Sequence, residues 1–345
     1  MTIREKTAIV IANKMKQYLL IFAAFFFSVF LQIFLTPVFA DSLSIDFEDP
    51  PYITGTINNQ DGWVSLGAVN PNIVLDHLVS AQILYPAFAS QSLRISNART
   101  TPTLSEQTYS RPLLNEAGET TALNGGLSGG TRQSHFEAEW DFASTVPEAE
   151  QRGLFVVAGL DRGDGSYMGK ITLTDRPTGL EVYFQGYNDM APFGSVAIAS
   201  DGCGPGGDGF PLMIVATELD RSIAHQIKIT TDFVDGAHND VVNIYIDGVL
   251  KLADTSWEDY YRWCSGTLDQ SRTVDSLIFV TEGLPAASTL DHGFYIDNLN
   301  LLSGPEPVAP PTSKDECKDD GWKAFNSPAF KNQGQCVAYF EHINK

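Results

Sequence analysis

The stretch "VVNIYIDGVLKLAD", residues 241–254, decides how this chain folds. Apolar residues recur at every second position up to Ile246, and a second apolar run covers Val249–Leu252, as in strands with one buried face. Between the two runs, Asp247-Gly248 supplies the left-handed backbone that a two-residue hairpin turn requires. The stretch therefore predicts an antiparallel β-hairpin whose register is fixed by its turn.

Short runs of the same kind follow one another from Asp41 onward, separated by Gly, Asn, Asp and Pro. The predicted strands are Ser44–Glu48, Leu93–Ser96, His135–Phe142, Gly153–Leu160, Lys170–Thr174, Leu180–Gln185, Leu212–Ala216, His225–Thr231, Val241–Ile246, Val249–Leu252, Leu277–Thr281 and Phe294–Leu301. These are more strands than an immunoglobulin-like domain contains. We therefore expect an all-β fold, a large two-sheet antiparallel jelly-roll sandwich.

Composition narrows the classes of partner. The chain has 345 residues, 43% of them hydrophobic, and a formal net charge of −20. Such an acidic surface repels nucleic acid and anionic lipid, so neither is an expected partner. Carboxylates are compatible with calcium, a hard cation that selects oxygen ligands.

The N-terminal segment resembles an export signal. Four basic residues precede an apolar run from about Tyr18 to Leu35, and Val38-Phe39-Ala40 suits signal-peptidase cleavage before Asp41. Residues 1–40 are therefore predicted to be a signal peptide of a secreted protein, extracellular or periplasmic. A retained membrane anchor is the alternative, because the run approaches spanning length. Contact with a membrane is expected only through such an uncleaved segment.

Export implies that the four cysteines form disulfides. Three pairings are formally possible, and the most economical joins Cys203 to Cys264 and Cys317 to Cys336, since each pair then lies within one part of the chain. The segment "SGPEPVAPPTS", residues 303–313, has four prolines and predicts a stiff extended spacer. We therefore expect a sandwich domain over 41–303, a Pro-rich linker over 304–314 and a small disulfide-bonded C-terminal module over 315–345.

Two segments carry a resemblance to a known family. "IDFEDPPYITGTINNQDGW" (45–63) and "HGFYIDNLNLLSG" (292–304) resemble the first and last strands of secreted bacterial concanavalin A-like, or laminin G-like, jelly-roll domains. "YIDGVLKLADTSWEDYYRW" (245–263) and "RTVDSLIFVTEG" (272–283) resemble the same group, and the tail "CKDDGWKAFNSPAFKNQGQCVAYF" (317–340) resembles a short module at the end of many exported bacterial proteins. The resemblance implies binding to carbohydrate or a surface polymer, and some branches of the fold are glycan hydrolases or lyases.

One predicted strand, "HFEAEWDF", places Glu137, Glu139 and Asp141 on a single face. Paired carboxylates of this kind perform the acid–base chemistry of glycosidases. The resemblance to sandwich-fold glucanases is incomplete, because their strand reads Glu-x-Asp with a second Glu further on, whereas this one reads Glu-x-Glu-x-Asp. The alternative is the solvated outer face of an amphipathic strand.

Calcium is the expected cofactor, in a structural role. In several jelly-roll binding domains the first and last strands lie side by side and share a cation, which would place it here near Asp46, Glu48 and Asp297. A spacing of two puts Asp46 and Glu48 on one face of the first strand. The alternative is that Asp46 and Asp297 only cap the ends of the sheet.

Aromatic residues crowd the segment that ends at Cys264. Trp257, Tyr260 and Tyr261 lie among Glu258, Asp259 and Arg262, a mixture that can stack on sugar rings and bind their hydroxyls. Alternatively, these rings form a disulfide-pinned plug over one end of the sandwich.

Together these patterns favour a secreted, non-catalytic module that binds a polysaccharide or cell-surface glycan. A polysaccharide-active enzyme using Glu137, Glu139 and Asp141 is one alternative, and a structural envelope or matrix protein is another. The sequence predicts no oligomeric state.

Overall fold

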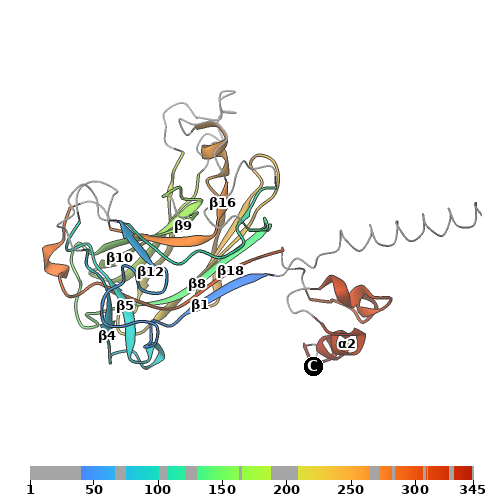
Figure 1. Cartoon of the computed structure of the whole chain (residues 1–345), viewed down its shortest axis with the longest axis horizontal. Coiled ribbons are helices and arrows are strands. Elements are labelled where there is room, and N and C mark those ends of the chain that lie inside the picture. The colour runs from blue at the N-terminus through green and yellow to red at the C-terminus, as the bar shows by residue number, and fades with distance from the viewer. Residues whose placement is uncertain are drawn as a thin grey trace, which may run out of the picture. The chain divides into compact units, whose positions relative to one another are not determined.

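Figure 1 shows the computed structural model of the chain, which describes residues 40–66, 75–100, 107–120, 130–162, 165–187, 209–264, 272–281, 284–305, 308, 310–325 and 330–343. Most regular structure in these ranges is β-strand, and the strands form two large antiparallel sheets. The predicted all-β jelly-roll sandwich is therefore confirmed.

The larger sheet has the order β15-β14-β13-β8-β18-β5-β4-β2, and β1 also pairs with β18. Its strands are β1 (Asp41–Ile45), β2 (Gly55–Thr56), β4 (His77–Ala81), β5 (Gln91–Ile95), β8 (His135–Ser144), β13 (His225–Asp232), β14 (Val241–Ile246), β15 (Val249–Asp254) and β18 (Phe294–Gly304). Along β8 the side chains alternate, with Trp140 and Phe142 fully buried and the acidic residues between them half-buried. The apolar residues of β8 thus face the core, as the sequence predicts.

The smaller sheet has the order β12-β11-β10-β9-β17-β6-β3. Its strands are β3 (Val64–Leu66), β6 (Gln107–Tyr109), β9 (Phe155–Asp161), β10 (Gly169–Arg176), β11 (Gly179–Gln185), β12 (Leu212–Leu219) and β17 (Ser276–Val280), and a separate pair joins β7 (Ala117–Gly118) to β16 (Thr273–Val274). Short helical segments in the described ranges are η1 (Pro86–Phe88), the π-helical η3 (Tyr260–Cys264), η4 (Ala287–Thr289), η5 (Asp315–Cys317), η6 (Gly321–Ala324) and α2 (Gln333–Ile343).

The core joins the two sheets through aromatic rings. Phe279 of β17 lies 6.2 Å from the ring of Trp63 and 6.5 Å from that of Trp140, centroid to centroid, and all three are fully buried. Burial of each such side chain stabilises the fold by about 1.5–3 kcal/mol. The two layers are thereby held face to face.

Each of the twelve predicted strands is present. The hairpin turn is confirmed as well, because Asp247 and Gly248 both have left-handed backbones, with φ of 51° and 75°. The strands that the sequence did not predict are short. Most have two or three residues. The five-residue β4 does not show the alternation of apolar and polar residues, because its first buried position is a histidine, His77.

The first strand differs from the prediction at its end. β1 pairs with β18 as expected, but it stops at Ile45 rather than Glu48. Phe47 has a φ of 55°, which breaks the extended backbone. Asp46 and Glu48 therefore follow the strand, and the expectation that strand pleating aligns their side chains is wrong.

At the C-terminus, Cys317 and Cys336 form the predicted disulfide, with their Cα atoms 5.8 Å apart. Both cysteines are buried with Phe330 in a small cluster that also contacts Trp322 and Tyr339. The domain boundaries predicted at residues 303 and 314 stay predictions. The proposed signal peptide, apart from Ala40, lies outside the described residues; within them, no helix has both the length and the apolar character needed to cross a bilayer.

Candidate functional site

Six aromatic side chains meet beside the start of β10, and we call this cluster the aromatic corner: Tyr167, Tyr187, Phe210, Trp257, Tyr260 and Tyr261. Phe210 is at its centre, 4.4 Å from the ring of Trp257 and 4.9 Å from that of Tyr260. The tilted and edge-on ring angles are those that aromatic pairs prefer. The corner is thus a packed unit built from four separate segments of the chain.

The backbone holds Trp257 in place. Its indole N–H donates to the carbonyl oxygen of Gln185 at 2.8 Å, and its backbone N–H donates to that of Met168 at 3.0 Å. The Lys170 ammonium lies 5.8 Å from the ring centroid of Tyr167 and 6.0 Å from that of Trp257, which is cation–π distance. A positive charge therefore borders the corner.

Exposure divides the three predicted ligand-binding aromatics. Trp257 is 7% exposed and Tyr261 5%, so both are packed against the core, whereas Tyr260 is half-buried, as is Phe210. The packing of Trp257 and Tyr261 agrees with a plug over the sheet. Tyr260 and Phe210 are the half-buried members of the corner, and the neighbouring Lys170 is half-buried as well.

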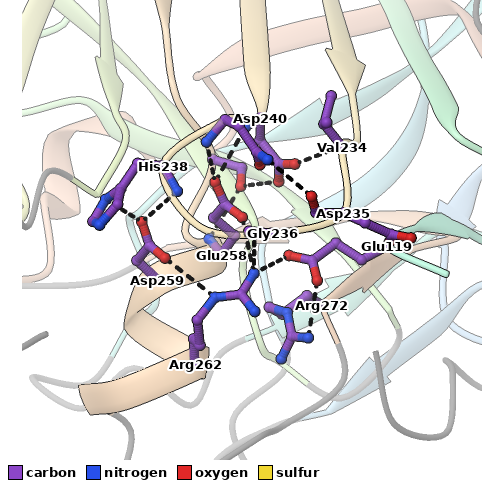
Figure 2. A network of polar contacts seen from close by, with 12 residues as sticks. Glu119, Val234, Asp235, Gly236, His238, Asp240, Glu258, Asp259, Arg262 and Arg272 are labelled. Atoms are coloured by element: carbon purple, nitrogen blue, oxygen red, sulfur yellow. Dashed lines mark hydrogen bonds and ion pairs between the residues drawn. The ribbon is translucent and has the colours of Figure 1, made fainter. Parts of the chain in front are cut away.

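A network of charged groups lies behind this segment (Figure 2). Glu258 accepts hydrogen bonds from the backbone N–H groups of Asn239 at 2.8 Å and Asp240 at 3.1 Å. Asp240 accepts from the N–H of Val234 at 3.0 Å and from the hydroxyl of Ser256 at 2.5 Å. These bonds tie the loop 234–240 to the segment that carries Trp257 and Tyr260.

Two arginines complete the network. Arg262 of η3 donates to Glu119, to Glu258 at 3.2 Å and to Asp259 at 3.3 Å, and Arg272 donates to Glu119 at 2.9 Å. Figure 2 shows Arg262 reaching toward Glu119, Glu258 and Asp259 from its helical turn. Its guanidinium thereby fixes η3 against the rest of the domain.

Burial dominates the protonation of the network. Burial, with the charges of Glu119 and Asp259, raises the pKa of Asp240 to about 7, against the opposing bonds from Ser256 and Val234. Burial, together with the charge of Asp240, raises the pKa of Glu258 to about 8. Burial likewise raises the pKa of Asp259, although His238 and Arg262 oppose the change.

Glu119, Asp240 and Glu258 are close enough to hold a metal ion, because one carboxylate oxygen from each lies within 4.8 Å of the others. The surrounding charges fit a cation poorly. Arg262 donates to two of the three carboxylates and Arg272 to one, so a divalent ion would lie beside guanidinium groups. The set therefore resembles a compensated ion-pair cluster more than a calcium site, which prefers unopposed oxygens.

The predicted catalytic acids lie on the outer face of the larger sheet, on β8. No residue of β8 belongs to the aromatic corner. The carboxylate of Glu137 accepts from the ring of His135 at 3.0 Å and from Lys228 at 2.5 Å. These bonds lower the pKa of Glu137 to about 2, against some opposing burial. His135 is itself held by Asp232 at 2.5 Å; burial lowers its pKa, but the bonds to both carboxylates raise it by more.

The other two acids of β8 are held differently. Gln226 donates to Glu139 at 3.4 Å, and Asn298 donates to Asp141 at 2.8 Å. Burial raises the pKa of Asp141, while the bond from Asn298 opposes that shift. The face is thus a polar, half-buried surface in which each acid has a fixed partner.

The predicted calcium ligands gather where β1 and β18 meet. Asp297 is 1% exposed and accepts from Ser92 at 2.7 Å and from the N–H of Asn298 at 2.8 Å. Burial, with the charges of Glu48 and Asp46, raises its pKa to about 7, although those bonds oppose the shift. Three acidic groups therefore act on one another here.

Glu48 is bound by neutral donors. It accepts from the N–H and hydroxyl of Ser90, at 2.8 and 2.5 Å, and from the N–H of Gln91 at 2.7 Å. Asp46 accepts from the N–H of Glu48 at 3.1 Å. In the described part of the chain no arginine or lysine bonds to these three acids, so the set fits a hard cation better than the arginine-bound cluster does.

Sequence reasoning missed Glu119, Asp240, Tyr167 and Phe210, because they are distant along the chain and meet only in the fold. Glu258 carried a signal, since it follows Trp257 directly. The predicted Cys203–Cys264 disulfide involves Cys203, which lies outside the described residues.

No protein-family model matches the chain, and no curated protein matches it either. Among solved structures, it is similar to an endo-1,3-beta-glucanase from Streptomyces sioyaensis, with a TM-score of 0.39 and 14% identity over 78% of this chain and 96% of the other. It is similar to an alginate lyase in complex with an alginate tetrasaccharide, with a TM-score of 0.38 and 15% identity over 76% of this chain and 96% of the lyase.

A sialidase is also similar, with a TM-score of 0.37 and 10% identity over 74% of this chain. This chain spans only 17% of the sialidase's length. At these identities and TM-scores, none of the three structures transfers site residues or an activity to this protein.

Proposed function

We propose that the protein is a non-catalytic module that binds a glycan or surface polymer through the aromatic corner. The observation that carries this proposal is the pair Phe210 and Tyr260, both half-buried, with ring centroids 4.9 Å apart and with Lys170 nearby. Aromatic rings stack on the apolar faces of sugars, and a lysine binds hydroxyl or carboxylate oxygens. The corner offers both kinds of contact.

The corner is also rigid before any ligand arrives. Trp257 is fixed by two hydrogen bonds to backbone carbonyls, and Arg262 fixes η3 through three carboxylates. Pre-ordered side chains lose little conformational entropy on binding, which favours affinity. A rigid, partly exposed aromatic surface is what a polymer-binding module needs.

The carboxylates of β8 support binding over catalysis. Glu137, with a pKa of about 2, stays ionised and bound to Lys228 and His135, so it is a poor proton donor. Asp141 is held by Asn298. We expect no sugar product when the protein is incubated with polysaccharides. If the wild type does form a product, and the Glu139→Gln and Asp141→Asn variants do not, the protein is instead a glycoside hydrolase or lyase.

The direct test is binding of the purified full chain to a broad glycan array, first with calcium and then with a chelator. We expect binding that Tyr260→Ala removes and that Tyr245→Ala, a change on the opposite sheet, leaves intact. Absence of binding in both conditions would contradict the proposal and favour a structural role in an envelope or matrix.

We further propose that calcium stabilises the fold at Asp46, Glu48 and Asp297, and that the protein is exported with residues 1–40 removed. The grouping of three acids supports the first proposal. The Cys317–Cys336 disulfide supports the second, because disulfides persist in oxidising compartments. Mass spectrometry of the secreted protein tests the export proposal, since it should begin at Asp41.

A further inference from the structure

The buried cluster behind the aromatic corner contains a carboxylate that no cation balances. Asp240 is 4% exposed, and both of its hydrogen-bond partners in the described part of the chain are neutral, the N–H of Val234 and the hydroxyl of Ser256. Its nearest oxygen lies within 4.8 Å of carboxylate oxygens of Glu119 and Glu258. To ionise all three carboxyls at once costs much free energy, because like charges repel one another strongly in a buried site.

A proton fits this position better than a metal ion. Arg262 and Arg272 already balance Glu119, and Arg262 also bonds to Glu258. A divalent cation would add two positive charges beside these guanidiniums, whereas one proton neutralises one buried carboxylate without adding a cation. The cluster's distances meet the requirement for metal binding, but its charges do not.

We propose that Asp240 and Glu258 hold one proton between them, and that this proton keeps the loop 234–240 docked on the segment that presents Tyr260. Loss of the proton places two negative charges against each other across that contact. Glu258 then repels Asp240 while still accepting its backbone N–H, so the two segments separate more easily. The effect on ligand binding rests on the proposed glycan-binding function; the shared proton does not.

Several charged groups in the described part of the chain surround this contact. They are Glu119 and Arg132 beside β7, Arg272 beside β16, Asp259 and Arg262 around η3, and Asp235 and His238 in the loop. His238 is 43% exposed and bonds to Asp259 rather than to Asp240. The arginines keep their charge at every pH considered, and the carboxyls of Asp240 and Glu258 are those whose pKa values rise to about 7 and about 8.

The direction of the pH effect follows from the raised pKa values of Asp240 and Glu258. In the unfolded chain these carboxyls lose their protons near pH 4, as ordinary carboxyls do. The folded protein keeps a proton that the unfolded chain releases, so stability falls as the pH rises from about 4 through the raised values. The stability that this proton contributes is fully present in acid and is lost under alkaline conditions.

The first experiment measures protons released on thermal unfolding of the full chain at pH 6, by calorimetry in buffers of different ionisation enthalpy. We expect the wild type to release about one proton more than Glu258→Gln or Asp240→Asn. Glu258→Gln mimics the protonated acid, so its Tm should fall less than that of the wild type between pH 6 and pH 9. Glu139→Gln, on the outer face of the larger sheet, should match the wild type.

If one variant fails to fold, the other is compared with the wild type at pH 6 by infrared spectroscopy. The carbonyl band of protonated carboxylic acids shows whether the variant has lost the protonated carboxyl. An unchanged proton count and an unchanged pH dependence of the Tm in both variants would overturn the proposal. A Tm increase with calcium or zinc at pH 8 that Glu258→Gln abolishes would also overturn it, in favour of a metal site.

Binding is measured separately, with the ligand found on the array. We expect affinity to fall at least several-fold between pH 6 and pH 9 in the wild type and to change little in Glu258→Gln. Equal pH dependence in both proteins overturns the link to Tyr260. If no glycan binds at all, the proposed function fails while the proton release still decides whether Asp240 and Glu258 share a proton.

Discussion

The ring of Tyr167 fills space that exists only because residue 159 is a glycine. A Cβ atom at Gly159 would lie 2.3 Å from Cδ1 of Tyr167 and 3.0 Å from Cγ2 of Ile278. Gly159 belongs to β9 of the smaller sheet, and Tyr167 packs edge-on against Trp257 at 5.6 Å. A backbone position in the sheet therefore sets where the aromatic corner lies.

The Gly159→Ala substitution should displace Tyr167 and loosen the corner. Overpacking of this kind costs about 1–3 kcal/mol of unfolding free energy. Chemical denaturation of the variant measures that loss, and glycan binding should weaken in parallel. The double variant with Tyr167→Ala relieves the clash, so it should recover part of the lost stability; failure to recover any would mean that the glycine serves another purpose.

Tyr260→Ala should weaken ligand binding by about tenfold or more, because central aromatic contacts typically contribute more than 1 kcal/mol. Isothermal titration with the ligand from the array measures the change. Tyr245→Ala is the matched control, since Tyr245 is a half-buried tyrosine of β14 in the other sheet. Equal losses in the two variants would place the ligand away from the aromatic corner.

Calcium should raise the Tm of the wild type, and a chelator should lower it. In Asp297→Asn a neutral amide replaces the buried carboxylate on which the charges of Glu48 and Asp46 act, so the response to calcium should disappear. Differential scanning calorimetry with and without calcium checks both statements. A full calcium response in Asp297→Asn would show that calcium binds elsewhere. The calcium response of Glu258→Gln then tests whether it binds at the buried cluster of Glu119, Asp240 and Glu258.

Acid should remove the contribution of Glu137. Its folded pKa of about 2 lies well below the ordinary value of a glutamate, mainly because of its bond to His135, so the folded state favours the ionised form. That stability is present above the unfolded pKa and is lost as the pH falls toward 2. We expect Glu137→Gln to lower the unfolding free energy by about 1–3 kcal/mol at pH 7, allowing for partial exposure.

Denaturation curves at several pH values measure this difference, which should shrink steadily from pH 5 to pH 2. Glu139→Gln controls for the loss of a carboxylate from the same strand. A constant difference across the pH range would show that the variant acts through packing rather than through charge.

Local patterns were sufficient for the longer strands except β4, and not for most of the strands of two or three residues. The alternation in β8 and the Asp247-Gly248 turn express contacts between residues close in sequence, so they are visible without a fold. The end of β1 was not predicted, because Phe47 adopts a left-handed backbone that nothing in its own side chain demands. Its buried position among the rings of Tyr52 and Trp63 accounts for that turn.

The sequence by itself determined the fold class, the hairpin register, the Cys317–Cys336 pair and the segment that carries Trp257 and Tyr260. Only the tertiary structure decided that Trp257 is buried while Tyr260 meets solvent, and that Glu119 and Asp240 gather behind them. The physical reason is the range of the interactions. Strand patterns and turns depend on neighbours along the chain, whereas burial and the pKa of a carboxylate depend on groups more than a hundred residues away.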